Sequence, residues 1–109
     1  MARLKTQLFV NAASRLADSD IIPFYVLKKG DADSGALFVE VEEDSQNSIL
    51  YSWSLSFEGD YEFIAISGDA PKPRYEIAEQ IEREIARDAD CWVVSVAGQK
   101  GLLLFSQIG

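Results

Sequence analysis

Residues 48–57 alternate between large apolar side chains and small ones, and this pattern constrains the fold more than any other feature of the chain. One set of positions holds Ile49, Tyr51, Trp53, Leu55 and Phe57. The intervening positions hold serine, with Leu50 as the exception. A period of two residues with one apolar face predicts a half-buried strand of an antiparallel sheet.

Two stretches carry the helical spacing of three and four residues instead. Apolar residues recur in this way over Leu4–Ala17, and Ile77, Ala78, Ile81 and Ile85 form a stripe within Arg74–Arg87. The remaining apolar or alternating runs, separated by turn formers, predict further strands at Ile22–Lys29, Ala36–Glu43, Tyr61–Ser67, Cys91–Val96 and Leu102–Phe105.

The run Cys91–Val96 is apolar at both parities, which predicts a central strand covered on both faces. Gly98-Gln99-Lys100-Gly101 resembles a hairpin turn, so Leu102–Phe105 is expected as the last strand. The order helix, four strands, helix, two strands predicts an α+β fold with a mostly antiparallel sheet of about six strands. We expect both helices on one face, with the serines and acids on the other. No linker divides the chain, so residues 1–109 are expected to form one domain.

Composition excludes several classes of function. The chain has no histidine and one cysteine, which excludes a Cys/His zinc site, a Ser-His-Asp triad and a disulfide framework. Cys91 lies beside Trp92 in an apolar strand, where burial makes a thiol unreactive. A single thiol fits a reducing cytoplasm, and no apolar run is long enough for a transmembrane helix.

The charge is concentrated in the middle of the chain. Ten Lys and Arg residues stand against 18 Asp and Glu residues, giving a net charge of −8. Between Gly30 and Pro71 there is no basic residue, whereas ten acidic residues fall there. This distribution argues against a nucleic acid or an anionic membrane as partner, and it favours a basic protein surface.

Two aspartate pairs are the candidate site residues. Asp31 and Asp33, followed by Gly35 and Glu42, resemble part of a calcium loop, but Gly35 and Ala36 stand at the wrong loop positions for an EF-hand. A looser cation site at Asp31 and Asp33 remains open beside the interpretation of a simple turn.

Asp88 and Asp90 form the second pair, just before the central strand. They would make a carboxylate acid/base site with the first pair if the two turns meet; otherwise they are turn residues. No cofactor-binding motif is present, since the glycines are too isolated for a phosphate loop. No catalytic residue is assigned.

Three short motifs carry a resemblance: Arg3-Leu4-Lys5, Lys29-Gly30-Asp31-Ala32-Asp33-Ser34-Gly35-Ala36 and Arg87-Asp88-Ala89-Asp90-Cys91-Trp92-Val93-Val94. In order and spacing they resemble a small alphaproteobacterial family of unknown function with the pattern R-L-K, R-x-G-D-x-D-A-G and D-P-D-x-W-V-V-E. This chain departs from the pattern at Ser34, Ala89 and Ser95, where Ala, Pro and Glu are usual. The resemblance implies a bacterial cytoplasmic protein and carries over no activity.

The sequence therefore favours a non-enzymatic binding or accessory protein that acts through protein–protein contacts. Its partner is expected to be a basic protein surface or a second copy of the chain. A homodimer would pair through Leu102–Phe105 if that strand lies at a sheet edge. The alternative is a small carboxylate-based enzyme or a cation-binding protein that uses Asp31, Asp33, Asp88 and Asp90.

Overall fold

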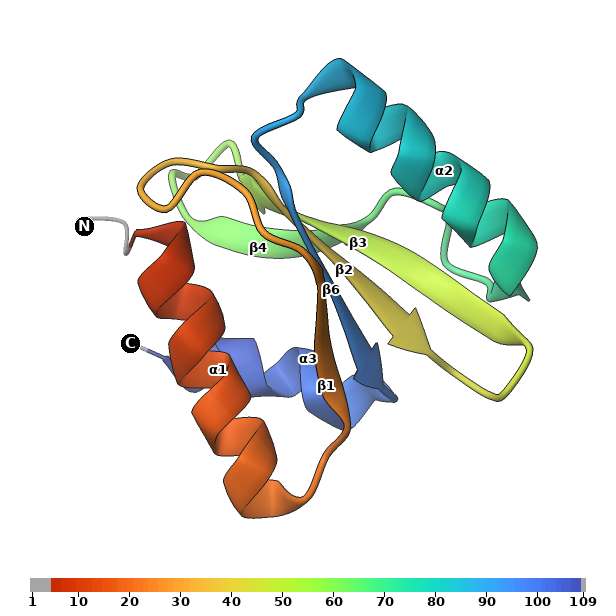
Figure 1. Cartoon of the computed structure of the whole chain (residues 1–109), viewed down its shortest axis with the longest axis horizontal. Coiled ribbons are helices and arrows are strands. Elements are labelled where there is room, and N and C mark those ends of the chain that lie inside the picture. The colour runs from red at the N-terminus through yellow and green to blue at the C-terminus, as the bar shows by residue number, and fades with distance from the viewer. Residues whose placement is uncertain (1–4, 109) are drawn as a thin grey trace.

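A computed structural model of the chain describes residues 5–108 and shows a six-stranded sheet between two helical layers (Figure 1). The elements in chain order are α1 (Thr6–Asp20), β1 (Phe24–Lys28), β2 (Leu37–Glu42), β3 (Asn47–Leu55), β4 (Tyr61–Ala65), β5 (Lys72–Pro73), α2 (Arg74–Arg87), β6 (Trp92–Ala97) and α3 (Gln99–Ser106). The α+β class with a mostly antiparallel sheet is confirmed. Within the described residues no helix has the length and apolarity needed to cross a membrane.

The strand order across the sheet is β1-β6-β2-β3-β4, with the short β5 paired to the start of β3. Every neighbouring pair is antiparallel except β2 and β6, which run parallel. Strand β6 thus enters between β1 and β2, and the chain reaches it through helix α2. The expectation of a buried central strand at Cys91–Val96 is confirmed, since Trp92 to Val96 are all buried.

Helices α1 and α3 cover one face of the sheet (Figure 1). Their buried side chains include Phe9, Val10 and Phe105, which contact the apolar side chains that β2 and β6 project from the same face. The Phe105 ring lies 5.0 Å from that of Phe9 and 5.4 Å from that of Phe63, measured between centroids. This face is a continuous apolar core.

Helix α2 covers part of the opposite face, so the expectation of both helices on one side is wrong. Its stripe of Ile77, Ile81 and Ile85 packs against Phe38 and Val93, which alternate with the residues of the first core. Hydrophobic periodicity shows that a helix has an apolar face, but it does not say which face of a sheet that stripe covers.

The last strand expected at Leu102–Phe105 is also wrong, because these residues belong to helix α3. Gly98, with φ of 78°, precedes the helix instead of turning a hairpin. Gly101 then brings the helix close to the sheet, since a Cβ there would lie 2.5 Å from the Cβ of Val96. Four apolar residues in a row fit a short strand and a short helix equally well.

The other elements agree with the sequence more closely. The helix expected at Arg74–Arg87 is confirmed with those bounds. The helix expected from Leu4 begins at Thr6, and Leu4 and Arg3 lie outside the described residues. The alternating strand runs over Asn47–Leu55 and ends before Phe57, which lies exposed in the following turn.

Candidate functional site

The two aspartate turns meet in space. The amide of Asp31 donates to the carbonyl oxygen of Asp90 at 2.8 Å. The indole Nε1 of Trp92 donates to the carbonyl oxygen of Asp31 at 2.7 Å. Both contacts involve the backbone of the turns, so the convergence does not by itself bring the carboxylates together.

Glycine makes this close approach possible. A Cβ on Gly30 would overlap the carbonyl oxygen of Asp90. A Cβ on Gly35 would lie 2.5 Å from the same oxygen and 2.9 Å from the Trp92 ring. Close contact between two backbones requires residues without a side chain, which explains the glycines on both sides of Asp31 and Asp33.

The carboxylates of the first turn bind local groups. Asp31 Oδ2 accepts hydrogen bonds from the amides of Asp33, at 3.2 Å, and Ser34, at 2.9 Å, and from the Ser34 hydroxyl at 3.1 Å. These bonds, led by the Ser34 amide, hold the pKa of Asp31 below its ordinary value. Asp33 forms an exposed ion pair with Lys5 at 3.5 Å. Asp31 therefore acts as the side-chain cap of a turn.

The second turn shows the same local use of a carboxylate. Asp88 Oδ1 accepts from the amide of Asp90 at 3.0 Å. The ammonium of Lys28 donates to the carbonyl oxygens of Ala89 and Cys91, the latter at 3.0 Å, and so holds this turn against β1. Across residues 5–108 no group of three or more potential metal ligands comes together. The cation-site hypothesis for Asp31 and Asp33 thus lacks, among the described residues, the further protein ligands that a calcium ion normally has. The carboxylate-enzyme hypothesis for Asp31, Asp33, Asp88 and Asp90 stays a prediction.

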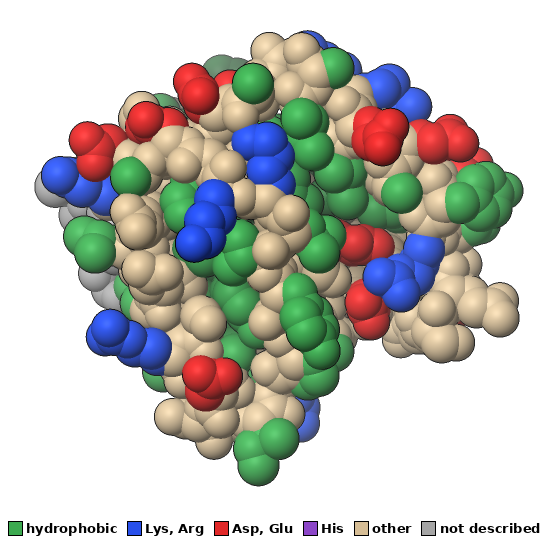
Figure 2. Space-filling model, in the orientation of Figure 1, with side chains coloured by type: hydrophobic (Ala, Val, Ile, Leu, Met, Phe, Trp, Pro, Cys, Tyr) green, Lys and Arg blue, Asp and Glu red, His purple; other side chains and the backbone are tan. Residues whose placement is uncertain are grey.

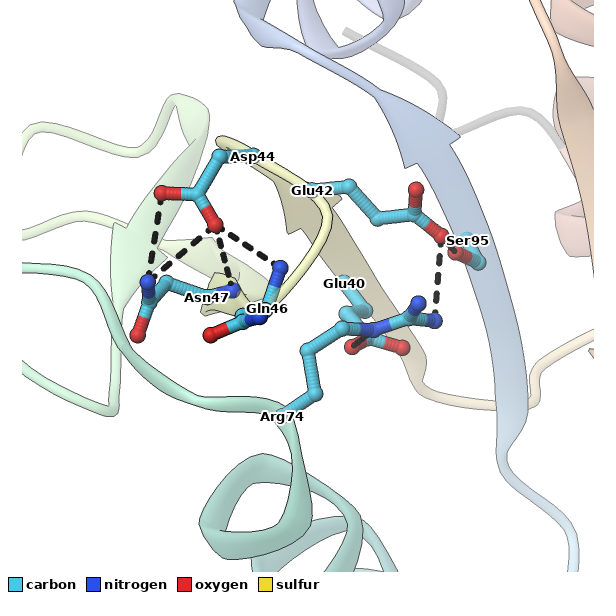
Figure 3. Close-up of polar contacts among 7 residues, drawn as sticks. All are labelled: Glu40, Glu42, Asp44, Gln46, Asn47, Arg74 and Ser95. Atoms are coloured by element: carbon cyan, nitrogen blue, oxygen red, sulfur yellow. Dashed lines mark hydrogen bonds and ion pairs between the residues drawn. The ribbon is translucent and has the colours of Figure 1, made fainter.

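The structure brings together a different polar cluster, which sequence reasoning missed. It consists of Glu40 and Glu42 on β2, Ser95 on β6 and Arg74 at the start of α2, and we call it the Glu–Arg cluster (Figure 3). Arg74 Nη2 lies 3.0 Å from Glu42 Oε1, and Arg74 Nε lies 3.5 Å from Glu40 Oε2. The Ser95 hydroxyl donates to Glu42 Oε1 at 3.4 Å.

The charges of the Glu–Arg cluster do not balance. One guanidinium faces two carboxylates, and the side chain of Glu40 is only 6% exposed. Charge-assisted hydrogen bonds are normally 2.7–2.9 Å long, so the contact to Glu40 is loose. The cluster is therefore an incompletely neutralised anionic site at the border of the α2 face.

A buried hydroxyl lies in the same part of the sheet. Ser48 is directly opposite Glu42 in the register of β2 and β3, so the two side chains project from the same face. Ser48 is fully buried, and among the described residues its Oγ is the buried side-chain polar atom that has no hydrogen-bond partner. Buried polar atoms are normally satisfied, so the Ser48 hydroxyl is an exception that a rearrangement of a neighbouring polar side chain would remove.

Tyr25 of strand β1 completes this surface. Register places Tyr25 beside Ser95, and Ser95 beside Glu40, in one row across three strands. Figure 2 shows a basic side chain between acidic ones at the side of a hollow in the surface. Exposed apolar side chains lie on the other side of this hollow, away from the part of the molecule that contains helix α2. We call the surface above the row of Tyr25, Ser95 and Glu40, with Arg74 and Glu42 next to it, the β1–α2 hollow.

The alternation in Leu37–Glu42 was the available signal for this site. Leu37, Val39 and Val41 alternate with Glu40 and Glu42, a pattern that places the two glutamates on the face opposite Leu37, and the structure has this arrangement. The sequence did not show that Arg74, 32 residues after Glu42, would reach the same place. A contact between distant segments requires knowledge of how the elements pack.

Comparisons with known proteins agree with this fold. The model of a family described as protein of unknown function (DUF1491) matches residues 4–106. A crystal structure of a DUF1491 family protein from Caulobacter crescentus is similar, with 26% identity, a TM-score of 0.77 and coverage of 91% of this chain and 92% of that one. A solution structure from A. tumefaciens has 29% identity, a TM-score of 0.70 and coverage of 88% and 86%. The search of curated proteins gives no match.

Proposed function

We propose that this chain, which belongs to the DUF1491 family of proteins of unknown function, is a non-enzymatic binding protein that acts through protein–protein contacts. Its docking element in this proposal is the outer edge of strand β1. The partner contributes an extended segment that adds a strand there, and the segment carries basic side chains. The family carries no activity with it, so the proposal rests on the geometry and charge of the chain.

The exposed apolar edge of β1 is the observation that carries the proposal. Strand β1 pairs with β6 on one side and forms an end of the sheet. The residues leading through it, 21–27, read Ile-Ile-Pro-Phe-Tyr-Val-Leu, and Tyr25, Val26 and Leu27 are 61%, 39% and 55% exposed. An exposed hydrophobic edge strand is a template for pairing with another chain, and proteins normally protect such edges with charge or cover.

The backbone of β1 is oriented for strand addition. The amide of Ala97 donates to the carbonyl oxygen of Pro23 at 3.2 Å, and the register continues through Tyr25 opposite Ser95. Antiparallel residues alternate between bonding to the partner strand and facing away from it. The N–H and C=O groups of Phe24 and Val26 therefore face the open side, where an incoming strand would bind them.

The charge of the chain supports a basic partner. The net charge is −8, and the Glu–Arg cluster beside β1 holds two carboxylates against one guanidinium. Complementary charge speeds the encounter of two proteins and rejects partners of the same sign. We place the interaction in the cytoplasm, which the single free thiol of Cys91 supports.

Site-specific photo-crosslinking in living cells tests this proposal. We would replace Tyr25 by a photoreactive phenylalanine analogue and make the matched replacement at Tyr61 on β4, the other end of the sheet. The expected result is a crosslinked partner at position 25, absent at position 61, whose crosslinked peptide carries Lys or Arg residues. Val26→Pro removes an outward N–H and should abolish this crosslink, because proline is tolerated at a strand edge but cannot donate a hydrogen bond.

Three outcomes would contradict the proposal. Equal crosslinking at positions 25 and 61, or none at 25, would show that β1 is not the docking edge. A crosslink between two copies of the chain at position 25 would replace the heterologous partner with a homodimer. The homodimer expected through Leu102–Phe105 has lost its structural basis, because these residues form part of helix α3.

A further inference from the structure

We propose that the β1–α2 hollow is a pocket for one arginine side chain of the partner, and that Arg74 occupies its acidic wall until the partner arrives. This inference rests on the proposed function, because it places one contact of the docked segment. The occupant is the guanidinium of a basic protein segment, which would lie between Tyr25 and Glu42.

The charge count is the first argument. Glu40 and Glu42 together carry two negative charges, and Arg74 returns one. Arg74 divides its guanidinium between the two carboxylates through single contacts of 3.5 and 3.0 Å, and does not form the two parallel bonds to one carboxylate that give the strongest pairing. A partner guanidinium that replaces Arg74 at Glu42 would leave Arg74 to pair with Glu40 alone, so that each carboxylate has its own cation.

The dimensions of the hollow are the second argument. Tyr25, Ser95 and Glu40 stand on three neighbouring strands, so the first and the last are about 10 Å apart at the backbone. A cation attracted to an aromatic face lies within about 6 Å of the ring centre. An ion pair to a carboxylate spans about 3–4 Å more. On these lengths, a guanidinium above the small Ser95 can reach both the ring of the exposed Tyr25 and a carboxylate on β2.

The unsatisfied Ser48 hydroxyl is the third argument, and it is independent of the charges. Ser48 lies opposite Glu42 on the same face, fully buried and without a hydrogen-bond partner. When Arg74 moves from Glu42, the Glu42 carboxylate becomes free to turn within its row toward Ser48. The hydroxyl would then donate to Glu42, while Glu42 still faces the incoming cation.

Arg74 is suited to stand in for the partner's arginine while no partner is bound. Its side chain is 44% exposed, and it lies at the first residue of α2, outside the apolar contacts made by Ile77. Its departure therefore leaves the packing of α2 intact. The long, flexible arginine side chain needs only a change of rotamer to release Glu42.

Nuclear magnetic resonance titration with Nα-acetyl-arginine amide tests the pocket directly. The probe should shift the amide signals of Tyr25, Glu42 and Ser95 in a saturable way. The citrulline analogue has the same shape without the charge, and it should not shift them. Glu42→Gln should weaken the binding of the arginine probe several-fold, because it removes the partly exposed carboxylate.

The decisive variant is Arg74→Gln, with Arg83→Gln as its matched control. Arg83 is an exposed residue of the same helix, so both changes remove one positive charge from α2. We expect Arg74→Gln to strengthen probe binding several-fold and Arg83→Gln to leave it almost unchanged. Weaker binding in Arg74→Gln, with its amide spectrum otherwise retained, would overturn the role of Arg74 as a substitute.

The result can be separated from that of the crosslinking experiment. Probe shifts spread over all acidic surfaces, or equal shifts with the citrulline analogue, would overturn the pocket. A crosslink at position 25 that persists in such a case would retain β1 as the docking edge without the pocket. Saturable probe binding without a crosslink would retain an arginine pocket and overturn strand addition.

Discussion

The two faces of the sheet are built from alternate residues of the same strands, yet they differ in composition. Among the described residues, the face under α1 and α3 buries a cluster of eleven apolar residues that includes Phe105, with Trp53 and Phe63 packed against it. The face under α2 has a smaller core of five buried residues. Beside that core lie the buried polar residues Glu40, Ser48 and Ser95.

The two faces of the sheet therefore differ in how much they contribute to the stability of the fold. Apolar burial, worth roughly 25 cal/mol per Å² of surface removed from water, is concentrated on the α1/α3 face. On the α2 face, part of that apolar burial is replaced by a charged cluster on β2 and α2, which β6 separates from the edge strand β1. Buried charges are weak evidence for stability, so the α2 face is where a binding role fits.

The largest expected effect comes from the α1/α3 face. Phe105→Ala should lower the free energy of unfolding by about 3–5 kcal/mol, because it leaves a cavity among Phe9, Phe24 and Phe63. Urea denaturation measures the loss. The matched control is Leu103→Ala on the same helix, where the side chain is 58% exposed and the change should stay within about 0.5 kcal/mol.

The α2 face supplies the comparison for this variant. Ile77→Ala should lower the free energy of unfolding by about 2–3 kcal/mol, less than Phe105→Ala, because its cluster is smaller. If Ile77→Ala proves the more destabilising of the two, the assignment of stability to the α1/α3 face is wrong.

An intermediate effect is expected in the Glu–Arg cluster. Glu40→Leu should keep the free energy of unfolding within about 1 kcal/mol of the parent, because an apolar residue of similar size removes a buried charge. Arg74→Leu should destabilise by about 1 kcal/mol or slightly more, since it leaves two carboxylates facing each other.

Denaturation of the two single variants and the double variant gives the coupling between the residues. Arg74→Leu should lower the free energy of unfolding by less in the Glu40→Leu background than in the parent. A large loss in Glu40→Leu alone would mean that the cluster stabilises the fold, and the contrast between the faces would weaken.

The smallest effect is expected at the turn that the Asp31 carboxylate caps. Hydrogen bonds hold the pKa of Asp31 below its ordinary value of 3.8, so its charged form favours the folded state. This contribution is complete above the unfolded pKa and is lost as pH falls through the lower folded pKa. Asp31→Asn should therefore lower the melting temperature at pH 7, and the difference from the parent should close below pH 3.8.

Asp33→Asn is the control for that measurement, because its ion pair with Lys5 is exposed and contributes little. A loss at Asp33 equal to that at Asp31, or a loss at Asp31 that does not change with pH, would show that the turn is not held by the Asp31 carboxylate.

Sequence patterns predicted those parts of the molecule whose structure is decided locally. The stripe of Ile77, Ile81 and Ile85 gave helix α2, and the double apolar parity of Cys91–Val96 gave the central strand. Helix α3 was missed, because the conformation of Leu102–Phe105 depends on tertiary packing. Leu102 and Phe105 pack in one core with residues of α1, β2 and β6, which are distant in the sequence. Local propensity is a weak guide where tertiary packing decides.

The candidate site followed the same division. The aspartate turns were recognised from their residue types, and the structure shows that they meet through Asp31 and Asp90. The Glu–Arg cluster was not predicted, because it joins Glu42 on strand β2 to Arg74 at the start of helix α2, two elements that are distant in the sequence. Charged residues in an alternating strand normally face water, and nothing local to Glu40 indicates its burial.

The insertion of β6 between β1 and β2 also determines the timing of assembly during synthesis. Strand β1 ends at residue 28, and β6, its neighbour in the sheet within residues 5–108, begins at residue 92, so 63 residues lie between them. At translation rates of about 5–20 residues per second, the segment Ile21–Leu27 waits roughly 3–13 s for that neighbour. Pro23 lies within this apolar stretch, and Lys28 and Lys29 follow it directly; a proline and flanking charges are the features that lower the aggregation of such a segment while it is exposed.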